Sequence, residues 1–158
     1  MTAASGISWS GLGGTFNLRV AAIITRGDEI LLCTADGLGY WFPPGGRVRF
    51  GESSDAALAR ELAGEPGLEL PAGKLALIAE NIHDSETLQH EIGMYYQVAW
   101  PGVLAPGDLQ GGTELGHRFR WTPAPALGSV RFEPAGLVPI LQALGDALEH
   151  VVLNRPEP

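Results

Sequence analysis

The feature that most restricts the fold is a pair of strand-like segments joined by a very short turn. Residues 15–25 read TFNLRVAAIIT and residues 29–35 read EILLCTA, and both are rich in strand-forming residues. The RGD between them is a turn signal, so the two segments predict a β-hairpin. A chain that contains this hairpin must build a sheet and cover the apolar faces of that sheet with its other elements.

The rest of the chain alternates further strands with two helices. Strands are predicted over 74–84, 87–100 and 117–123, and helices over 53–64 and 135–150. The second helix is predicted because leucine and isoleucine recur there at helical spacing. The order strand, strand, helix, three strands, helix indicates an α/β (α+β) fold with a mixed sheet between helices.

Length and apolar content fit one domain. We expect it to span 15–153, between a loose Gly/Ser-rich segment at 1–14 and a tail at 154–158, and 45% apolar residues suffice for a core. No apolar run approaches the ~20 residues that span a bilayer, and the N-terminus lacks a signal-peptide pattern. These observations predict a cytoplasmic protein without a membrane partner, and the single Cys33 excludes an intrachain disulfide.

The charge of the chain bears on its partners. The formal net charge is −8 and Lys74 is the only lysine, which argues against a nucleic acid partner. A small polyanionic substrate would need local arginines, or divalent cations held by the protein's own carboxylates. A homodimer remains open.

The stretch FPPGGRVRFGESSDAALARELAGEPGL, residues 42–68, combines a Pro/Gly loop with an acidic helix. Glu61 and Glu65 are four residues apart, so a helix places both on one face, either as a solvated acidic surface or as metal ligands. Gly46 lets the backbone approach closely, so that its carbonyl can point at an ion. Arg60 can fold back onto Glu52 as a bidentate pair that joins loop to helix.

The spacing within this stretch resembles the Nudix box. It reads Gly46, five residues, Glu52, seven residues, Arg60-Glu61-Leu62, two residues, Glu65, one residue and Gly67-Leu68. The order of elements over about 15–150 is also similar to that of Nudix hydrolases. The resemblance implies a three-layer α/β/α Nudix sandwich, and hydrolysis of a nucleoside diphosphate linked to another moiety, by water attack assisted by Mg²⁺ or Mn²⁺.

The resemblance also implies roles for individual residues. The carbonyl of Gly46 and the carboxylates of Glu61 and Glu65 would bind metal. Arg60 and Glu52 would complete the catalytic set, with Glu52 acting first as scaffold. In this family a further acidic residue from a later loop often joins these metal ligands. Glu114 is the first candidate for that acid and Glu91 the second.

The box departs from the family pattern at one position. Nudix proteins carry two adjacent glutamates where this chain has Gly64 followed by Glu65. The loss of one carboxylate leaves two interpretations: an active hydrolase, or a weakened Nudix domain that binds or senses a nucleotide.

Candidate substrate contacts lie beside the box. Arg47 and Arg49 alternate with apolar residues and could contact phosphate or face solvent. Trp41 could stack on a base or pack in the core. Glu91 is also a candidate substrate contact. Nucleoside triphosphates come first as substrates by elimination only, followed by ADP-ribose-like compounds and nucleotide sugars.

Overall fold

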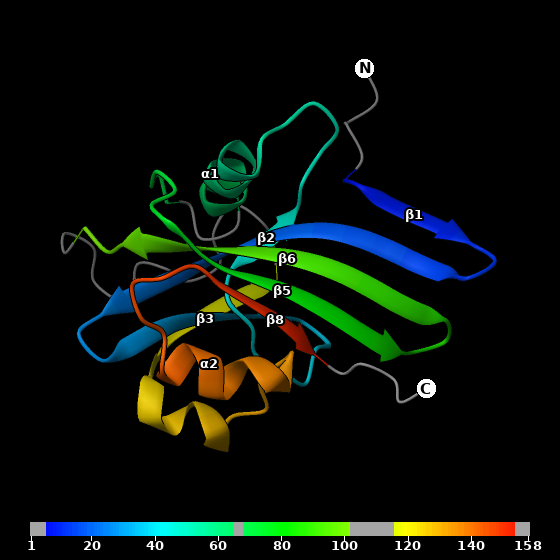
Figure 1. Cartoon of the computed structure of the whole chain (residues 1–158). Coiled ribbons are helices and arrows are strands. Elements are labelled where there is room, and N and C mark those ends of the chain that lie inside the picture. Colours follow the sequence, from blue (N-terminus) through cyan, green and yellow to red (C-terminus); the bar gives the residue numbers. More distant parts are fainter. Residues whose placement is uncertain (1–5, 65–67, 102–115, 154–158) are drawn as a thin grey trace.

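The computed structural model describes residues 6–64, 68–101 and 116–153. In these ranges an eight-stranded sheet has the main order β7-β3-β2-β6-β5-β8, with β1 and β4 also paired to β2 (Figure 1). Its strands are β1 (Ser8–Gly11), β2 (Gly14–Arg26), β3 (Glu29–Ala35), β4 (Gly45–Arg47), β5 (Leu75–Asp84), β6 (Leu88–Ala99), β7 (His117–Pro123) and β8 (Glu149–Leu153).

The sheet is mixed, as predicted. β2 runs parallel to β6 and β5 runs parallel to β8, whereas the β2–β3, β5–β6 and β3–β7 pairs are antiparallel. The predicted hairpin is β2–β3, with Thr25 opposite Ile30. The β2–β6 register matters for the site, because it aligns Asn17 with Glu91 and Arg19 with Gly93.

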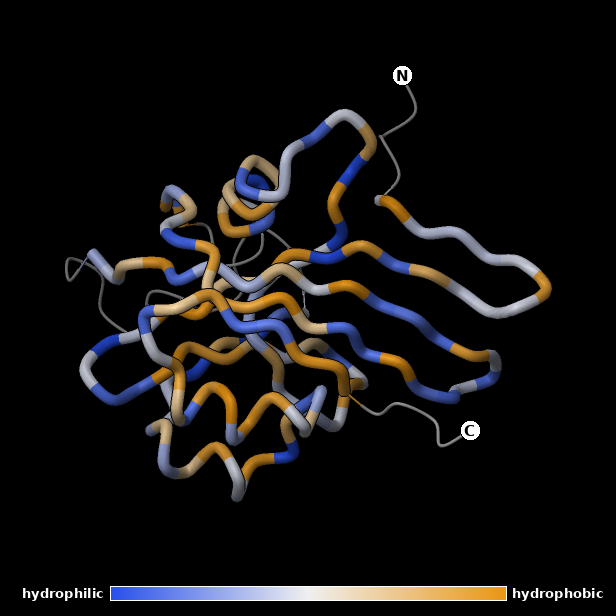
Figure 2. The backbone as a smooth tube through the Cα atoms, viewed as in Figure 1, coloured by the Kyte–Doolittle hydropathy of each residue, from blue (hydrophilic) through white to orange (hydrophobic). Residues whose placement is uncertain are grey.

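Helices cover both faces of the sheet. Helix α1 (Ser54–Gly64) packs Leu58 and Leu62 onto one face, in a cluster with Val20 and Ile24 of β2. The opposite face carries two 3-10 segments, η2 (Ala124–Ser129) and η3 (Ala135–Leu137), and helix α2 (Val138–Gln142). Their apolar residues, orange in Figure 2, face a second cluster. The predicted three-layer α/β/α sandwich is therefore confirmed.

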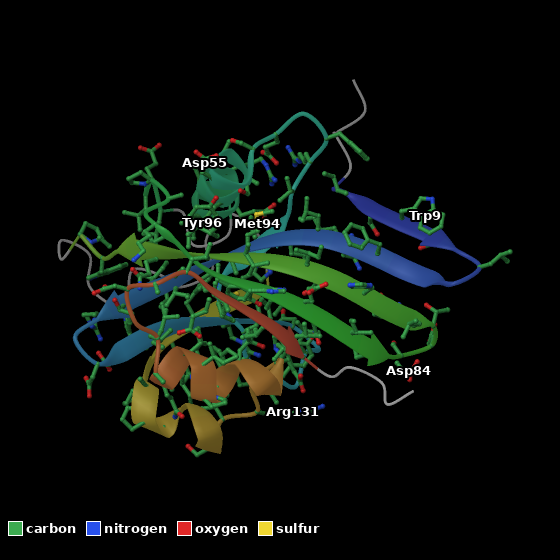
Figure 3. All side chains as sticks on the ribbon, in the orientation of Figure 1. Trp9, Asp55, Asp84, Met94, Tyr96 and Arg131 are labelled. Carbon is green, nitrogen blue, oxygen red and sulfur yellow. The ribbon has the colours of Figure 1, made fainter. Side chains whose placement is uncertain are left out.

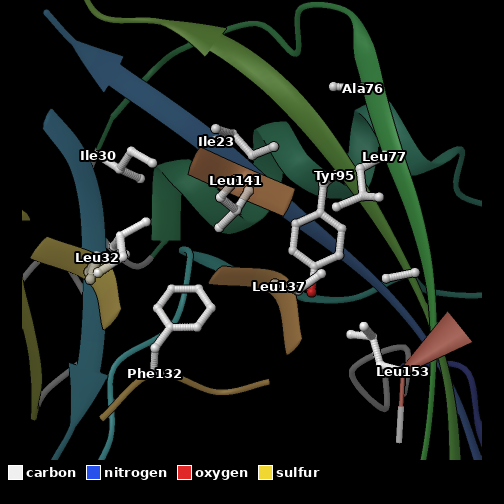
Figure 4. Packing of buried hydrophobic residues seen from close by; sticks show 12 residues of the cluster. Ile23, Ile30, Leu32, Ala76, Leu77, Tyr95, Phe132, Leu137, Leu141 and Leu153 are labelled. Carbon is white, nitrogen blue, oxygen red and sulfur yellow. The ribbon is translucent and has the colours of Figure 1, made fainter. Parts of the chain in front are cut away.

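The second cluster is built around aromatic and leucine side chains. Figure 4 shows Tyr95 of β6 beside Leu137 and Leu77, with Phe132 and Leu141 nearby. All five are almost completely buried. Burying a side chain of this size contributes about 1.5 to 3 kcal/mol, so this face holds the short α2 region in place.

Two sequence expectations about the ends of the domain are wrong. The segment 1–14 is not loose throughout, because β1 pairs with β2 from Ser8 opposite Asn17 to Gly11 opposite Gly14. The helix expected over 135–150 is divided into η3 and α2 and stops at Gln142, and the chain then enters β8. Parallel pairing of β8 with β5 supplies its backbone with hydrogen-bond partners, and Leu148, which a long helix would bury, is 53% exposed. The expected tail at 154–158 lies outside the described residues.

Among the helices of the described ranges, none combines the length and apolar character that crossing a bilayer requires.

Candidate functional site

Helix α1 is fixed against the sheet at its start and along its length. The hydroxyl of Ser54 lies 2.8 Å from that of Tyr96 on β6, which Figure 3 labels beneath the helix. Ala57, Leu58 and Leu62 are completely buried. The next described residue after the helix, Leu68, donates its N–H to the carbonyl of Leu62 at 2.8 Å. This face of α1 is therefore rigid, and its polar residues have defined positions.

The Glu61 carboxylate lies directly against the backbone of Gly46. β4 pairs Gly46 with Val20 of β2, and a Cβ added at Gly46 would lie 2.3 to 2.6 Å from the carboxyl atoms of Glu61. Any side chain at position 46 would displace that carboxylate. The Glu61 side chain is only 15% exposed, so this carboxylate is held in close contact with the Gly46 backbone.

Arg60 joins the loop before the helix to the helix itself. Its Nε donates to Oε1 of Glu52 at 2.7 Å and its Nη2 to Oε2 at 2.9 Å, the predicted bidentate pair. Nη2 also donates to the carbonyl of Arg47 at 3.0 Å, and Nη1 contacts the Glu61 carboxylate. One guanidinium thus orients both carboxylates and the end of β4.

The same contacts set the electrostatics of the scaffold. Hydrogen bonds from Arg60, with a further one from the Arg49 N–H at 2.9 Å, lower the pKa of Glu52 to about 2. The Glu52 hydrogen bonds in turn raise the pKa of Arg60, with a smaller contribution from Glu61. Both carboxylate oxygens of Glu52 thus accept hydrogen bonds, from Arg60 and from the Arg49 N–H.

The oxygen donors assembled here suit a hard divalent cation. Mg²⁺ and Mn²⁺ prefer carboxylate and carbonyl oxygens, and the Glu61 carboxylate lies against the backbone of Gly46. Glu65 and Glu114 lie outside the described residues. Within the described ranges no group of three or more His, Cys, Asp or Glu side chains is placed to hold an ion. The residues fit a metal that one or more carboxylates beyond these ranges would help to hold.

The residues predicted to contact substrate lie in different parts of the structure. Arg47 is exposed, and Arg49 is partly exposed with its N–H used by Glu52. Trp41 packs against the core cluster under α2, with the Arg120 guanidinium 4.3 Å from its ring centroid. Its neighbours Tyr40 and Phe42 line a cavity, with ring centroids 5.9 Å apart.

That cavity, of about 630 Å³, lies on the sheet face opposite α1. It begins at Gly45, one residue from the glycine that meets Glu61, and extends to Arg131, which Figure 3 shows on the side of α2. Glu91 lines it, with its Oε2 3.8 Å from Nε of Arg19. Glu91 is thus a pocket residue, and it lies on the other face of the sheet from Glu61.

A sequence comparison decides the family. The family model described as NUDIX domain matches residues 15–143. The chain belongs to this family. The matched range includes Gly46, Glu52, Arg60 and Glu61.

Individual relatives support the same assignment. A protein of Mycobacterium tuberculosis named "Putative 8-oxo-dGTP diphosphatase 2" is 47% identical over 55 residues, which cover 32% of this chain and 39% of that protein. The match therefore spans about two fifths of the curated relative. The fold is similar to that of the MutT protein from Methanosarcina mazei Go1, with TM-score 0.65 and 21% identity over 81% of this chain and 91% of that one. The E. coli ORF135 protein is 28% identical with TM-score 0.55, covering 81% and 87% of the two chains.

Sequence reasoning missed most of the cavity. Asn17, Arg19 and Asn81 all line it, and none was singled out. A signal was present, because Asn17 and Arg19 alternate with Phe16, Leu18 and Val20 within a strand otherwise rich in apolar residues. Two polar residues on one strand face indicate that this face meets solvent or a ligand rather than the core.

Proposed function

We propose that this Nudix protein hydrolyses a phosphoanhydride bond of a nucleoside diphosphate derivative with Mg²⁺ or Mn²⁺. The observation that carries the proposal is the Glu61 carboxylate seated on the backbone of Gly46 and oriented by Arg60. The arrangement requires a glycine at position 46, because any side chain there would displace the carboxylate. It also requires the ion pair between Arg60 and Glu61. A helix with a purely structural role would need neither feature.

In the proposed reaction, water attacks a phosphorus atom and the anhydride oxygen leaves with the second phosphate. Glu61, Glu65 and the Gly46 carbonyl would hold the divalent ion, which supplies positive charge to the phosphate oxygens and lowers the pKa of water. A carboxylate of the site accepts the proton of the attacking water. Arg60 and Glu52 join the loop to the helix through two hydrogen bonds, which would keep Glu61 beside the Gly46 backbone.

Nucleoside triphosphates are the first substrates to test. The M. tuberculosis relative is named for 8-oxo-dGTP, and the matched M. mazei structure is a MutT protein. ADP-ribose and nucleotide sugars follow as the second group, because a cavity of about 630 Å³ has room for more than a base.

A substrate panel tests the proposal. We expect purified protein to hydrolyse at least one of the nucleoside triphosphates, 8-oxo-dGTP, ADP-ribose or UDP-glucose with Mg²⁺ or Mn²⁺, and none of them in excess chelator. Glu61→Gln should lower kcat by at least a hundredfold. Glu69→Gln, which alters an exposed glutamate just beyond the box, should leave kcat unchanged.

The panel also separates the second candidate function, which the replacement at Gly64 favours. Tight nucleotide binding by calorimetry, with no product after long incubation at high protein concentration, would identify a binding or sensing domain. Turnover that survives in chelator, or in Glu61→Gln at the full rate, would reject the metal-assisted mechanism.

A further inference from the structure

The N-terminal segment, residues 6–11, meets the loop of the Nudix box at the edge of β2. Leu18 of β2 donates its N–H to the carbonyl of Ile7 at 3.1 Å, and its own carbonyl accepts from the N–H of Val48 at 3.1 Å. Ile7 in turn donates its N–H to the carbonyl of Val48 at 2.6 Å. These backbone hydrogen bonds close a ring that joins the N-terminal segment, β2 and the residue after β4.

Val48 is held in this ring by its backbone and by its side chain. Both its N–H and its carbonyl are bonded within the ring, and its side chain is 2% exposed in the cluster beneath α1. Ile7 packs against the same cluster. One residue further along each chain, Gly6 forms an antiparallel bridge with Arg49. The N-terminal segment therefore lines the loop for two residues and fixes the position of Val48.

The two neighbours of Val48 bind the Arg60–Glu52 pair through their backbone. The carbonyl of Arg47 accepts from Nη2 of Arg60 at 3.0 Å. The N–H of Arg49 donates to Oε2 of Glu52 at 2.9 Å. Because Val48 lies between these two backbone groups, the ring that holds Val48 also sets where they point.

We propose that the N-terminal segment positions the metal site, an inference that rests on the proposed function and adds Gly6 and Ile7 to its working parts. The guanidinium of Arg60 contacts the Glu61 carboxylate as well as Glu52. Ile7 acts on Glu61 through Val48 and Arg60, so it is a positioning residue and not a ligand. Opening the ring should release the Arg60–Glu52 pair and weaken metal binding at Glu61.

Gly6 fits its place because it has no side chain. A Cβ there would lie 2.9 Å from Cδ of Arg47 and would overlap the Cβ of that arginine. A Cβ is fixed to its backbone, so the whole residue at position 47 would have to move, including the carbonyl that binds Arg60. A methyl group at position 6 should therefore act on the metal site from outside the Nudix box.

Amide hydrogen exchange tests the inference in the wild-type protein. If opening the ring weakens metal binding, bound metal must oppose that opening by the same factor. We expect saturating Mg²⁺, without substrate, to slow exchange of the Ile7 amide by about fivefold or more, as read by NMR. The Ala124 amide is the control, since it bonds the carbonyl of Asp28 at 2.8 Å near the other end of β2. Its exchange should change by less than about twofold.

Two glycines of the same segment give a matched pair of variants. In calorimetry without substrate, Gly6→Ala should weaken Mg²⁺ and Mn²⁺ binding by about fivefold or more, the factor that reciprocity requires. Gly11→Ala is the control. A Cβ there would meet the ring of Trp9, which is 66% exposed and can rotate into solvent. Metal binding by Gly11→Ala should stay within about twofold of wild type, because its methyl group does not reach Arg47.

A second substitution distinguishes positioning from a general loss of stability. Arg47→Gly removes the Cβ that obstructs an alanine at position 6 and keeps the carbonyl that binds Arg60. Metal affinity of the double variant should return to within about twofold of that of Arg47→Gly alone. A general loss of stability would not be rescued in this way, because glycine within a strand destabilises it further.

These measurements fail separately from the proposed function. Metal binding coupled to the Ile7 amide, with no substrate hydrolysed, would support the inference and overturn the hydrolase. Hydrolysis together with equal metal affinity in wild type and Gly6→Ala, or with Mg²⁺ protection of Ile7 no larger than that of Ala124, would overturn the inference alone. A wild type that binds neither Mg²⁺ nor Mn²⁺ would overturn both. The exchange measurement decides the matter even if Gly6→Ala does not fold.

Discussion

Arg60 donates two hydrogen bonds to Glu52, which lies eight residues earlier in the sequence: Nε to Oε1 at 2.7 Å and Nη2 to Oε2 at 2.9 Å. The side chains are 26% and 17% exposed, so the pair is shielded but not desolvated. This contact joins the loop before α1 to the helix, and the same guanidinium also contacts Glu61 and the Arg47 carbonyl.

Replacing the guanidinium with an ammonium should break that unit. Lysine cannot form the bidentate pair, so Arg60→Lys is expected to lower the free energy of unfolding by about 1 to 3 kcal/mol and kcat by at least tenfold. Urea unfolding and initial rates measure the two effects. Arg26→Lys is the matched control, since Arg26 pairs with Glu29 at the far end of β2; it should leave kcat unchanged. Full activity in Arg60→Lys would remove the scaffold role.

Acid should weaken the same contact in a defined range. The pKa of Glu52 is about 2 in the folded protein and 4.5 ordinarily. A lowered folded pKa means that its contribution to stability is complete above about pH 4.5 and is lost as the pH falls toward 2. We expect Glu52→Gln to be less stable than wild type at pH 6, with the difference shrinking between pH 4.5 and 3 in urea unfolding. A difference independent of pH over this range would contradict the assignment.

The elements that sequence predicted are those whose local pattern and tertiary role agree. β3 and β7 occupy the predicted residues. α1 ends at Gly64 as predicted, because Ala57, Leu58 and Leu62 recur at helical spacing and are all buried. β4 and β8 were missed, since their backbone pairing with β2 and β5 is decided by distant strands and not by their own composition.

The site divides in the same way. Its half near α1 could be predicted because the box fixes the spacing of Gly46, Glu52, Arg60 and Glu61 in one continuous segment. The cavity half could not, because Asn17, Glu91 and Asn81 become neighbours only through the β2–β6 and β5–β6 registers. Strand register depends on the whole sheet, so the spacing of residues within one segment does not predict that these three side chains are neighbours.

A methyl group at position 46 should disable the site with little effect on the fold. In Gly46→Ala the new Cβ would meet the Glu61 carboxyl atoms at 2.3 to 2.6 Å, and that side chain must rotate away. We expect kcat to fall at least tenfold and the apparent affinity for Mn²⁺ to weaken, while Tm changes little. Gly128→Ala is the control, because a Cβ there meets nothing within 4 Å. Unchanged kcat in Gly46→Ala would mean that this contact is not used in catalysis.

A side chain at Gly93 should affect nucleotide binding in the cavity and not the metal, because the Tyr95 ring lies over this glycine. In Gly93→Ala the new Cβ would lie 2.9 Å from Cε2 of Tyr95, so the ring is pushed away from the glycine. We expect the hydrolysed nucleotide to bind at least fivefold more weakly, with an unchanged concentration of Mg²⁺ for half-maximal rate. Calorimetry and a metal titration of the rate read the two separately. A shift in the metal requirement alone would show that the cavity and the metal site are not distinct.

The residue that departs from the family pattern provides the sharpest test of how α1 faces the metal. Gly64→Glu adds a carboxylate three residues after Glu61, at the last described residue of the helix. Without metal, like-charge repulsion costs a few tenths of a kcal/mol, which the better helix propensity of glutamate offsets. With Mg²⁺ or Mn²⁺ the variant should bind metal more tightly, seen as a larger metal-dependent rise in Tm than in wild type. If the wild-type site has lost function, kcat should rise as well; if it has adapted to fewer ligands, kcat should stay level or fall while metal affinity increases. An equal metal-dependent shift of Tm in the two proteins would show that position 64 does not face the metal, and the assignment of this helix face would have to be abandoned.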